Sequence, residues 1–274
     1  MLNDSKEIHL VLSGGAARGI AHIGVIEVLE EAGYRIRSVS GTSMGALVGA
    51  VYASGQLEAF KRALFKVSLA EIVKLLDFTF KYPGLIKGDK IMHWLAPYLS
   101  SRPIEELPLP YLAMATDLAH KTEVVFDRGD LATAVRASIS IPSIFVPVYR
   151  DDQILVDGGV LNNIPVDKSP RHDGLPVVAV WVNADVPCDD ELRRIMHSHP
   201  RRQVSDELHM RDVVINSLHL MMRKISTGIL RQNPPDLLIS VPYRLAPFYD
   251  FLKAKPIYEA GRVIARRALN NALP

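Results

Sequence analysis

The chain has 274 residues, of which 48% are hydrophobic and 23% charged, a composition typical of a soluble globular protein with a sizeable core. Its formal net charge of +2 gives no support to nucleic-acid binding, because basic pairs such as Arg193-Arg194 stand beside acidic or apolar residues. Cys188 is the single cysteine, which excludes an internal disulfide and fits a reducing compartment, and the first residues lack the apolar run of a signal peptide.

The N-terminal part alternates strand-like and helix-like patterns. Residues 7–15 form a short β-branched run that ends in glycines, as buried strands and their exit turns do. Residues 20–33 have apolar side chains at helical spacing, and a short strand follows around 36–40. A second helix is expected through 44–55. This strand–helix–strand–helix order predicts a parallel sheet buried on both faces.

Residues 38–57 carry no charge and contain glycines at four-residue spacing, as some membrane helices do. However, the segment is rich in Ser and Gly and poor in Leu, Ile and Phe. We therefore interpret it as including a buried helix whose glycines let it press against a sheet.

The rest of the chain continues with mixed signals. Residues 58–101 indicate amphipathic helix with an aromatic-rich centre, and strand-like runs follow at 111–118, 122–127, 153–159 and 176–185. Between them, Asp130 is placed to cap a helix through 131–138. After residue 185 the chain becomes charged and rich in turns, and two further helices are predicted at 212–230 and 256–270.

Gly41-Thr42-Ser43-Met44-Gly45 fits the Gly-x-Ser-x-Gly pattern at a strand-to-helix turn. A serine there exposes its hydroxyl on a strained backbone, and glycines on both sides avoid a clash. The following helix directs its N-terminal N–H groups toward developing negative charge. The alternative is a plain tight turn, but the position between an apolar run and a glycine-spaced helix favours a nucleophile.

Residues 13–19, Ser-Gly-Gly-Ala-Ala-Arg-Gly, offer backbone N–H donors for an oxyanion, although the same residues also suit a simple strand-to-helix turn. A dinucleotide-binding loop is excluded because Ala16 replaces the second glycine of that pattern. A phosphate-binding loop is excluded because Ile20 stands where lysine is needed.

The group that takes the proton of Ser43 is harder to find. The later histidines lie in charged loops or late helices, none of them at a strand end beside a glycine turn, and no metal-ligand pattern accompanies them: His172, His197, His199, His209 and His219. Asp157 instead ends a strand-like run and precedes two glycines. It is either a turn former or a base, and the second role requires burial or the substrate to raise its pKa.

These stretches together resemble the patatin-like phospholipases, a family with a Ser–Asp dyad and no catalytic histidine. The glycine loop GGAARG, the elbow GTSMG and the turn DGG occur in family order, and the resemblance covers residues 8–183. It implies an α/β fold, three-layer α/β/α with a mostly parallel central sheet. We expect residues 1–274 to form a single domain of this type, with 185–274 as its mostly helical C-terminal part.

The resemblance implies Ser43 as the nucleophile and Asp157 as the base. It further implies an oxyanion hole formed by Gly14, Gly15 and the N–H of Ala16. Many members have a third glycine where this chain has Ala16. Alanine keeps the N–H but does not easily take a positive φ, which puts the geometry of the hole in doubt.

Arg18 matches a basic position of the family, where it either orders the loop or faces a substrate phosphate; we favour the ordering role. Asn163 and Pro165 match a stretch that shapes the turn after Asp157. The aromatic-rich segment 77–99 either caps an acyl channel or is ordinary core packing, with a slight preference for packing. The resemblance calls for no metal and no cofactor.

The function implied is hydrolysis of carboxylic esters of phospholipids, lysophospholipids or related acyl lipids through an acyl-serine. Alternatives are a Ser–His–Asp hydrolase, a non-hydrolytic lipid-binding or regulatory protein on the same scaffold, and an acyltransferase. The expected partner is the acyl lipid itself, with no nucleic acid. The expected location is the cytoplasm, and peripheral contact with a membrane and the oligomeric state stay open.

Overall fold

The computed structural model describes residues 6–79, 83–170, 173–197 and 210–272. Within these ranges the strands form one mixed sheet in the order β5-β6-β3-β2-β1-β7-β8, with β4 paired to β3. The strands are β1 Glu7–Leu12, β2 Arg35–Thr42, β3 Tyr111–Asp117, β4 Thr122–Phe126, β5 Val148–Arg150, β6 Gln153–Asp157, β7 Val177–Ala184 and β8 Leu237–Pro242. β1, β2, β3, β7 and β8 pair in parallel, whereas β4, β5 and β6 run antiparallel to their neighbours.

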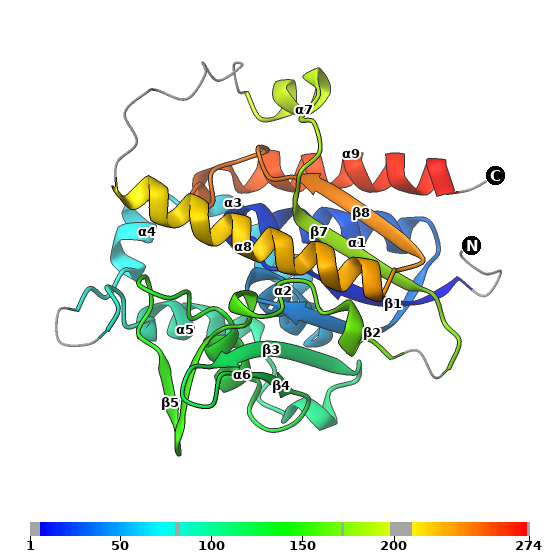
Figure 1. Ribbon diagram of the computed structural model, residues 1–274. Helices are drawn as coiled ribbons and strands as arrows, with labels where there is room; N and C mark the ends of the chain where they lie inside the picture. Colours follow the sequence, from blue (N-terminus) through cyan, green and yellow to red (C-terminus); the bar gives the residue numbers. More distant parts are fainter. Residues whose placement is uncertain (1–5, 80–82, 171–172, 198–209, 273–274) are drawn as a thin grey trace.

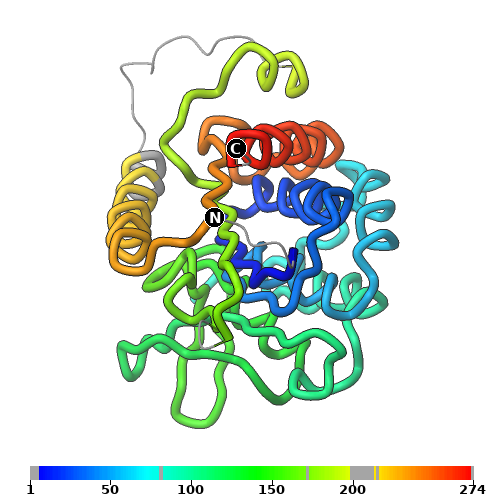
Figure 2. Tube along the Cα trace, turned by 90° about the vertical axis from the view of Figure 1, so that its right-hand side faces the viewer, coloured from blue at the N-terminus to red at the C-terminus, as the bar shows by residue number. Residues whose placement is uncertain are grey.

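Helices cover both faces of this sheet (Figures 1 and 2). They are α1 Ala21–Glu31, α2 Met44–Ala53, α3 Leu57–Lys66, α4 Leu69–Leu75, α5 Asp89–Leu95, α6 Leu131–Ser138, α7 Asp190–Ile195, α8 Met210–Gln232 and α9 Ala254–Ala272. Figure 2 shows α8 (yellow) on one side of the sheet and α1 and α9 (blue and red) on the other. This arrangement confirms the predicted α/β/α fold.

The central strands are buried on both faces, so successive residues belong to different layers. Leu10 of β1 and Val178 of β7 lie in the large cluster that includes α1, α2 and α9. Val11 and Ala179, their chain neighbours, pack instead in a smaller cluster with Ile229 of α8. The continuous apolar runs of the sequence are explained by this double burial.

The C-terminal helix α9 packs closely on α1 because both helices have a glycine at the crossing. A Cβ on Gly24 would lie 2.3 Å from the carbonyl oxygen of Tyr258, and one on Gly261 would lie 2.3 Å from that of Ala21. Side chains at either glycine would force the helices apart. This packing supports the proposal that residues 185–274 belong to the same domain.

Most predicted elements are confirmed, but one predicted stretch is divided and some observed elements were not predicted. The helices expected at 44–55, 131–138, 212–230 and 256–270 are observed as α2, α6, α8 and α9. Turns divide the stretch 58–101 into α3, α4 and α5, and the strands β5 and β8 and the short helix α7 were not predicted. The uncharged segment 38–57 contains α2, which is buried in the core, and among the described residues no helix is long and apolar enough to cross a membrane.

Candidate active site

Ser43 lies in the turn that joins β2 to α2. Its φ of 54° and ψ of −123° are values that residues other than glycine rarely adopt, so the backbone is strained at this serine. The turn is held by buried hydrogen bonds: the Ser43 N–H donates to Ser138 Oγ at 2.8 Å, and the Thr42 hydroxyl donates to the Asn162 carbonyl at 2.8 Å. The strain is therefore supported by contacts on both sides of the turn.

The glycines of the elbow are required by close backbone approach. A Cβ on Gly41 would lie 2.6 Å from the amide nitrogen of Ala46, in the first turn of α2. A Cβ on Gly45 would lie 2.2 Å from the carbonyl oxygen of Leu12, at the end of β1. No side chain fits at either position without moving backbone, so the Gly-x-Ser-x-Gly pattern follows from packing of the turn against α2 and β1.

Asp157, at the end of β6, lies beside Ser43, which follows β2. Thr42, the last residue of β2, pairs with Met114 of β3, and the next β3 residue, Ala115, pairs with Asp157 of β6. β6 thus continues along β3 where β2 turns away into the elbow, which places Asp157 beside Ser43. Asp157 ends its strand as expected, but β6 is antiparallel to β3 and approaches from the opposite direction.

The environment of Asp157 favours its neutral form. The carboxyl is buried, and burial raises its pKa from 3.8 to about 6, although the nearby Ser43 hydroxyl and the N–H of Gly159 act in the opposite direction. The Gly159 N–H donates to Oδ1 at 2.7 Å, whereas Oδ2 has no hydrogen bond of ordinary geometry. Asp157 therefore has one oxygen fixed by the backbone and one free to accept a proton.

The glycine loop lies against this pair. A Cβ on Gly14 would lie 3.1 Å from the Cβ of Ser43, and one on Gly15 would lie 2.2 Å from Val182 Cγ2. The Gly14 N–H donates to the Asn163 carbonyl at 2.9 Å, so this expected oxyanion donor is already bonded here. The N–H groups of Gly15 and Ala16 have no acceptor among the residues that the structure describes.

Ala16 adopts the conformation that its side chain disfavours. Its φ is 46°, in the left-handed region where glycine is preferred. Ala16 therefore has the backbone conformation expected of the glycine that many family members have here, and its side chain makes this conformation strained.

Arg18 is buried rather than open to solvent, with 3% exposure. Its Nε and Nη2 donate to Asn183 Oδ1 at 3.0 and 2.6 Å, and Nη1 donates to the Ala246 carbonyl at 3.0 Å. Burial lowers the pKa of the guanidinium to about 10, which still leaves it charged near neutral pH. Asn183 in turn donates to the Gly14 carbonyl at 2.8 Å, and these contacts favour a loop-ordering role for Arg18.

His22 contributes to the site although the sequence reasoning did not consider it. Its Nε2 lies 2.8 Å from the carbonyl oxygen of Ser13, so Nε2 carries the proton and donates it there. The ring is fully buried, Nδ1 has no partner, and burial lowers its pKa to about 4, so it is neutral. The bond fixes the Ser13–Gly14 peptide plane. The signal in the sequence was a single histidine among the apolar residues of the helix at 20–33.

No described histidine makes a hydrogen bond to Ser43 or Asp157. His219 packs edge-on against Phe248, with ring centroids 6.4 Å apart, and His197 follows α7 at the surface. His172, His199 and His209 lie outside the described residues. Within the described ranges, no group of three His, Cys, Asp or Glu side chains is arranged to hold a metal ion.

The aromatic-rich segment 77–99 divides into two parts. Trp94 and Tyr98 pack against Phe60, with ring centroids 6.0 and 5.5 Å apart, and so belong to the core. Phe78 is 60% exposed. Phe80 and Tyr82 lie outside the described residues.

Comparisons with known proteins identify the family of the chain. Residues 10–168 match the family model described as patatin-like phospholipase. An uncharacterized NTE family protein of Mycobacterium bovis is 30% identical over 332 aligned residues, which cover 97% of this chain and 92% of that protein. Patatin-like phospholipase domain-containing protein 6 of Mus musculus is 34% identical over 183 residues, which cover 65% of this chain but only 14% of the mouse protein.

Among solved structures, VipD from Legionella pneumophila is similar with a TM-score of 0.61. The similarity covers 97% of this chain and 66% of VipD, at 13% sequence identity. At this identity the similarity concerns the fold alone.

Proposed function

The chain belongs to the patatin-like phospholipase family, and from this premise we propose that it is a lipid acyl hydrolase with Ser43 as nucleophile and Asp157 as general base. The family supports lipid hydrolysis in general. The observation that carries the finer proposal is the strand register, which brings a buried carboxyl with a raised pKa beside the strained serine.

The reaction begins with the ionised carboxylate. Asp157 takes the proton of the Ser43 hydroxyl as Oγ attacks the ester carbonyl, and the N–H groups of Gly15 and Ala16 donate to the oxyanion that forms. Collapse of this intermediate breaks the ester C–O bond, Asp157 returns the proton to the leaving alcohol, and an acyl-serine remains. Water then attacks the acyl-serine, with Asp157 again as base, and releases the fatty acid.

The raised pKa of Asp157 suits this role. A carboxylate with the ordinary pKa of 3.8 is a weak base, whereas one with a pKa near 6 is a stronger base and is still ionised at neutral pH. Burial therefore supplies part of what a histidine supplies in other serine hydrolases.

The substitutions Ser43→Ala and Asp157→Asn test the proposal with a soluble p-nitrophenyl ester and with phospholipid in detergent micelles. Each should lower kcat by about 10³-fold or more while the circular dichroism spectrum is unchanged. His197→Ala and His219→Ala serve as matched controls and should keep wild-type rates. An Asp157→Asn enzyme with full activity would refute the role of Asp157, and loss of activity in a histidine variant would favour a Ser–His mechanism. Turnover that depends on Ser43 would also exclude a purely lipid-binding role.

A further inference from the structure

The helix α4 and the segment after it present large apolar side chains to solvent. No residue of α4 is buried, and Leu69 and Val73, one turn apart, are 63% and 57% exposed. Phe78 and Leu85, in the following segment, are 60% and 53% exposed. We name these four side chains the α4 rim. Leu69 and Val73 share one face of α4, and Phe78 pairs with Ile86, the chain neighbour of Leu85. Exposed apolar side chains that gather in this way mark a contact surface.

The α4 rim is connected to the candidate active site through backbone hydrogen bonds. The N–H groups of Leu85 and Ile86 both donate to the carbonyl of Ile144, at 3.0 and 2.9 Å. Ile144 belongs to the segment after α6, and the carbonyl of Ser140 in the same segment accepts the N–H of Asp157 at 2.9 Å. A surface that bound at the rim would therefore lie next to the segment that holds the proposed base.

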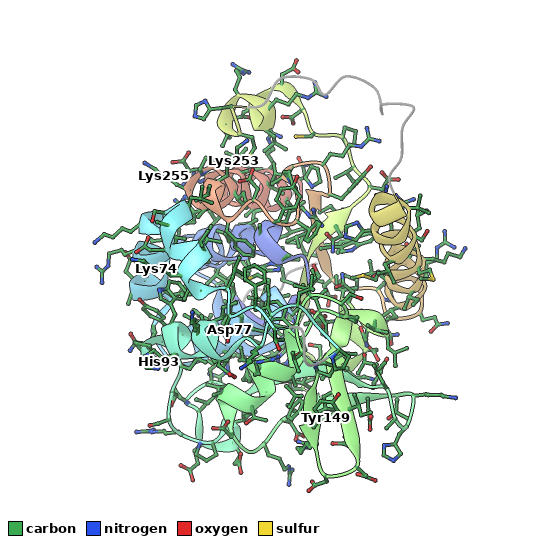
Figure 3. The ribbon with its side chains drawn as sticks, turned by 90° about the vertical axis from the view of Figure 1, so that its left-hand side faces the viewer. Lys74, Asp77, His93, Tyr149, Lys253 and Lys255 are labelled. Atoms are coloured by element: carbon green, nitrogen blue, oxygen red, sulfur yellow. The ribbon has the colours of Figure 1, made fainter. Side chains whose placement is uncertain are left out.

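Figure 3 views the molecule from the side toward which the parallel strands end, with α4 and α5 in cyan and the labelled Lys74, Lys253 and Lys255 in view. The same side carries the elbow, because Ser43 follows directly after the end of β2. The helix α4, these lysines and the candidate site are thus on one side of the protein.

Several lysines around the α4 rim form no ion pair with the residues that the structure describes. Four lysines between residues 66 and 90 are exposed and form no ion pair with a described residue: Lys66, Lys74, Lys87 and Lys90. Of the nearby carboxylates, those of Glu71 and Asp77 are engaged at helix N-termini, whereas Asp89 in the first turn of α5 is exposed. Glu71 accepts the N–H of Ser68 at 2.7 Å in a capping box, and Asp77 accepts the N–H groups of Gly88 and Asp89 at 2.8 Å each.

Resting on the proposed function, we propose that the α4 rim docks the protein on an anionic lipid surface. The rim side chains then lie at the boundary between headgroups and acyl chains, and the four lysines between residues 66 and 90 lie among the headgroups. Exposed apolar side chains combined with unpaired lysines are the pattern of peripheral membrane contacts. A protein partner fits less well, because lysine is depleted from protein–protein interfaces. The docked orientation presents the elbow side of the molecule to the lipid.

Vesicle co-sedimentation tests the docking on a Ser43→Ala background, so that binding is measured without hydrolysis. The vesicles are phosphatidylcholine alone and phosphatidylcholine mixed with phosphatidylserine. We expect binding to the mixed vesicles, and about tenfold or greater loss of affinity when Leu69→Ser and Val73→Ser are combined. Lys74→Gln with Lys90→Gln should remove most of the preference for phosphatidylserine. Val125→Ser, at an exposed position of β4 outside the rim, is the matched control and should bind as the background protein does.

The outcomes separate docking from catalysis. Rim variants that bind the mixed vesicles as tightly as the control would overturn the docking proposal, whether or not the enzyme hydrolyses lipid. The same holds if size-exclusion chromatography shows a dimer that the rim substitutions dissociate while vesicle binding is unchanged, because the occupant is then a second copy of the chain. Vesicle binding that depends on the rim in a protein without Ser43-dependent hydrolysis would support docking and refute only the proposed function. Circular dichroism checks that the background protein and the rim, lysine and control variants, whose added substitutions are all at exposed positions, stay folded.

Discussion

Replacing Asp157 with asparagine should remove activity and should make the fold more stable at pH 8 relative to pH 4 than the wild type is. The buried carboxyl has a pKa of about 6 in the folded protein, against 3.8 as its ordinary value. Between these pH values the folded state holds a proton that the unfolded chain has released, so this group lowers the free energy of unfolding as pH rises through the window. Asparagine carries no such charge, and its carbonyl can accept the same Gly159 N–H.

The magnitude follows from the two pKa values. One pKa unit corresponds to about 1.4 kcal/mol, so ionising Asp157 in the folded protein costs about 3 kcal/mol more than in the unfolded chain. The amide itself has a cost in this buried site, but that cost is the same at every pH. The change in stability caused by Asp157→Asn should therefore be about 2 to 3 kcal/mol more favourable at pH 8 than at pH 4.

Urea denaturation of wild type and Asp157→Asn at pH 4 and pH 8, followed by circular dichroism, measures this difference directly. Asp117→Asn is a control of opposite sign. Asp117 is buried, and its His120 partner and backbone N–H groups lower its pKa to about 2 despite burial, so its charge stabilises the fold above its ordinary pKa of 3.8. Asp117→Asn should therefore destabilise the protein at pH 8. An Asp157→Asn protein whose stability change is equal at both pH values would refute the raised pKa.

Substitutions at three positions, His22, Ala16 and Gly45, test the elbow and the glycine loop, with Gly228 on α8 as a control position. His22→Leu should lower kcat about tenfold with little change in KM, and His22→Gln, which keeps an N–H donor, should restore most of it; equal kcat in both variants would exclude a positioning role. Ala16→Gly should raise the free energy of unfolding by about 1 kcal/mol in urea denaturation, because glycine accepts the positive φ, and a loss of stability would argue against strain there. Gly45→Ala should destabilise by about 3 kcal/mol or more in the same assay, whereas Gly228→Ala, in open space on α8, should stabilise slightly; similar effects of the two would contradict the packing of the elbow.

The sequence was sufficient for those parts of the fold that depend on local patterns. The apolar runs of β1 and β7, the Asp130 cap of α6, whose carboxylate accepts the Thr133 N–H at 2.7 Å, and the glycines of the elbow all follow from residue type and spacing. The family was recognisable from the glycine loop, the elbow and the turn after Asp157, and the resemblance to that family implied the three-layer fold.

Features that depend on pairing between distant segments were not predictable. The antiparallel entry of β6 beside β3 is set by strand register, and a single sequence does not fix which strands pair. The hydrogen bond from the Gly14 N–H to the Asn163 carbonyl joins residues about 150 positions apart in the chain. The positive φ of Ala16 is a strained conformation that the residue type itself disfavours. The sequence also does not reveal that α4 is exposed, because the spacing of its apolar residues is the same as in a helix packed on a core.

The most direct test of the proposed dyad is covalent trapping of the serine. The protein is treated with a long-chain alkyl fluorophosphonate in detergent micelles, and the adduct is located by peptide mass spectrometry. We expect one adduct on Ser43, absent in Ser43→Ala, strongly slowed in Asp157→Asn, and forming faster in wild type as pH rises through about 6, where Asp157 ionises. An adduct on another residue, or wild-type labelling rates in Asp157→Asn, would contradict the Ser43–Asp157 mechanism.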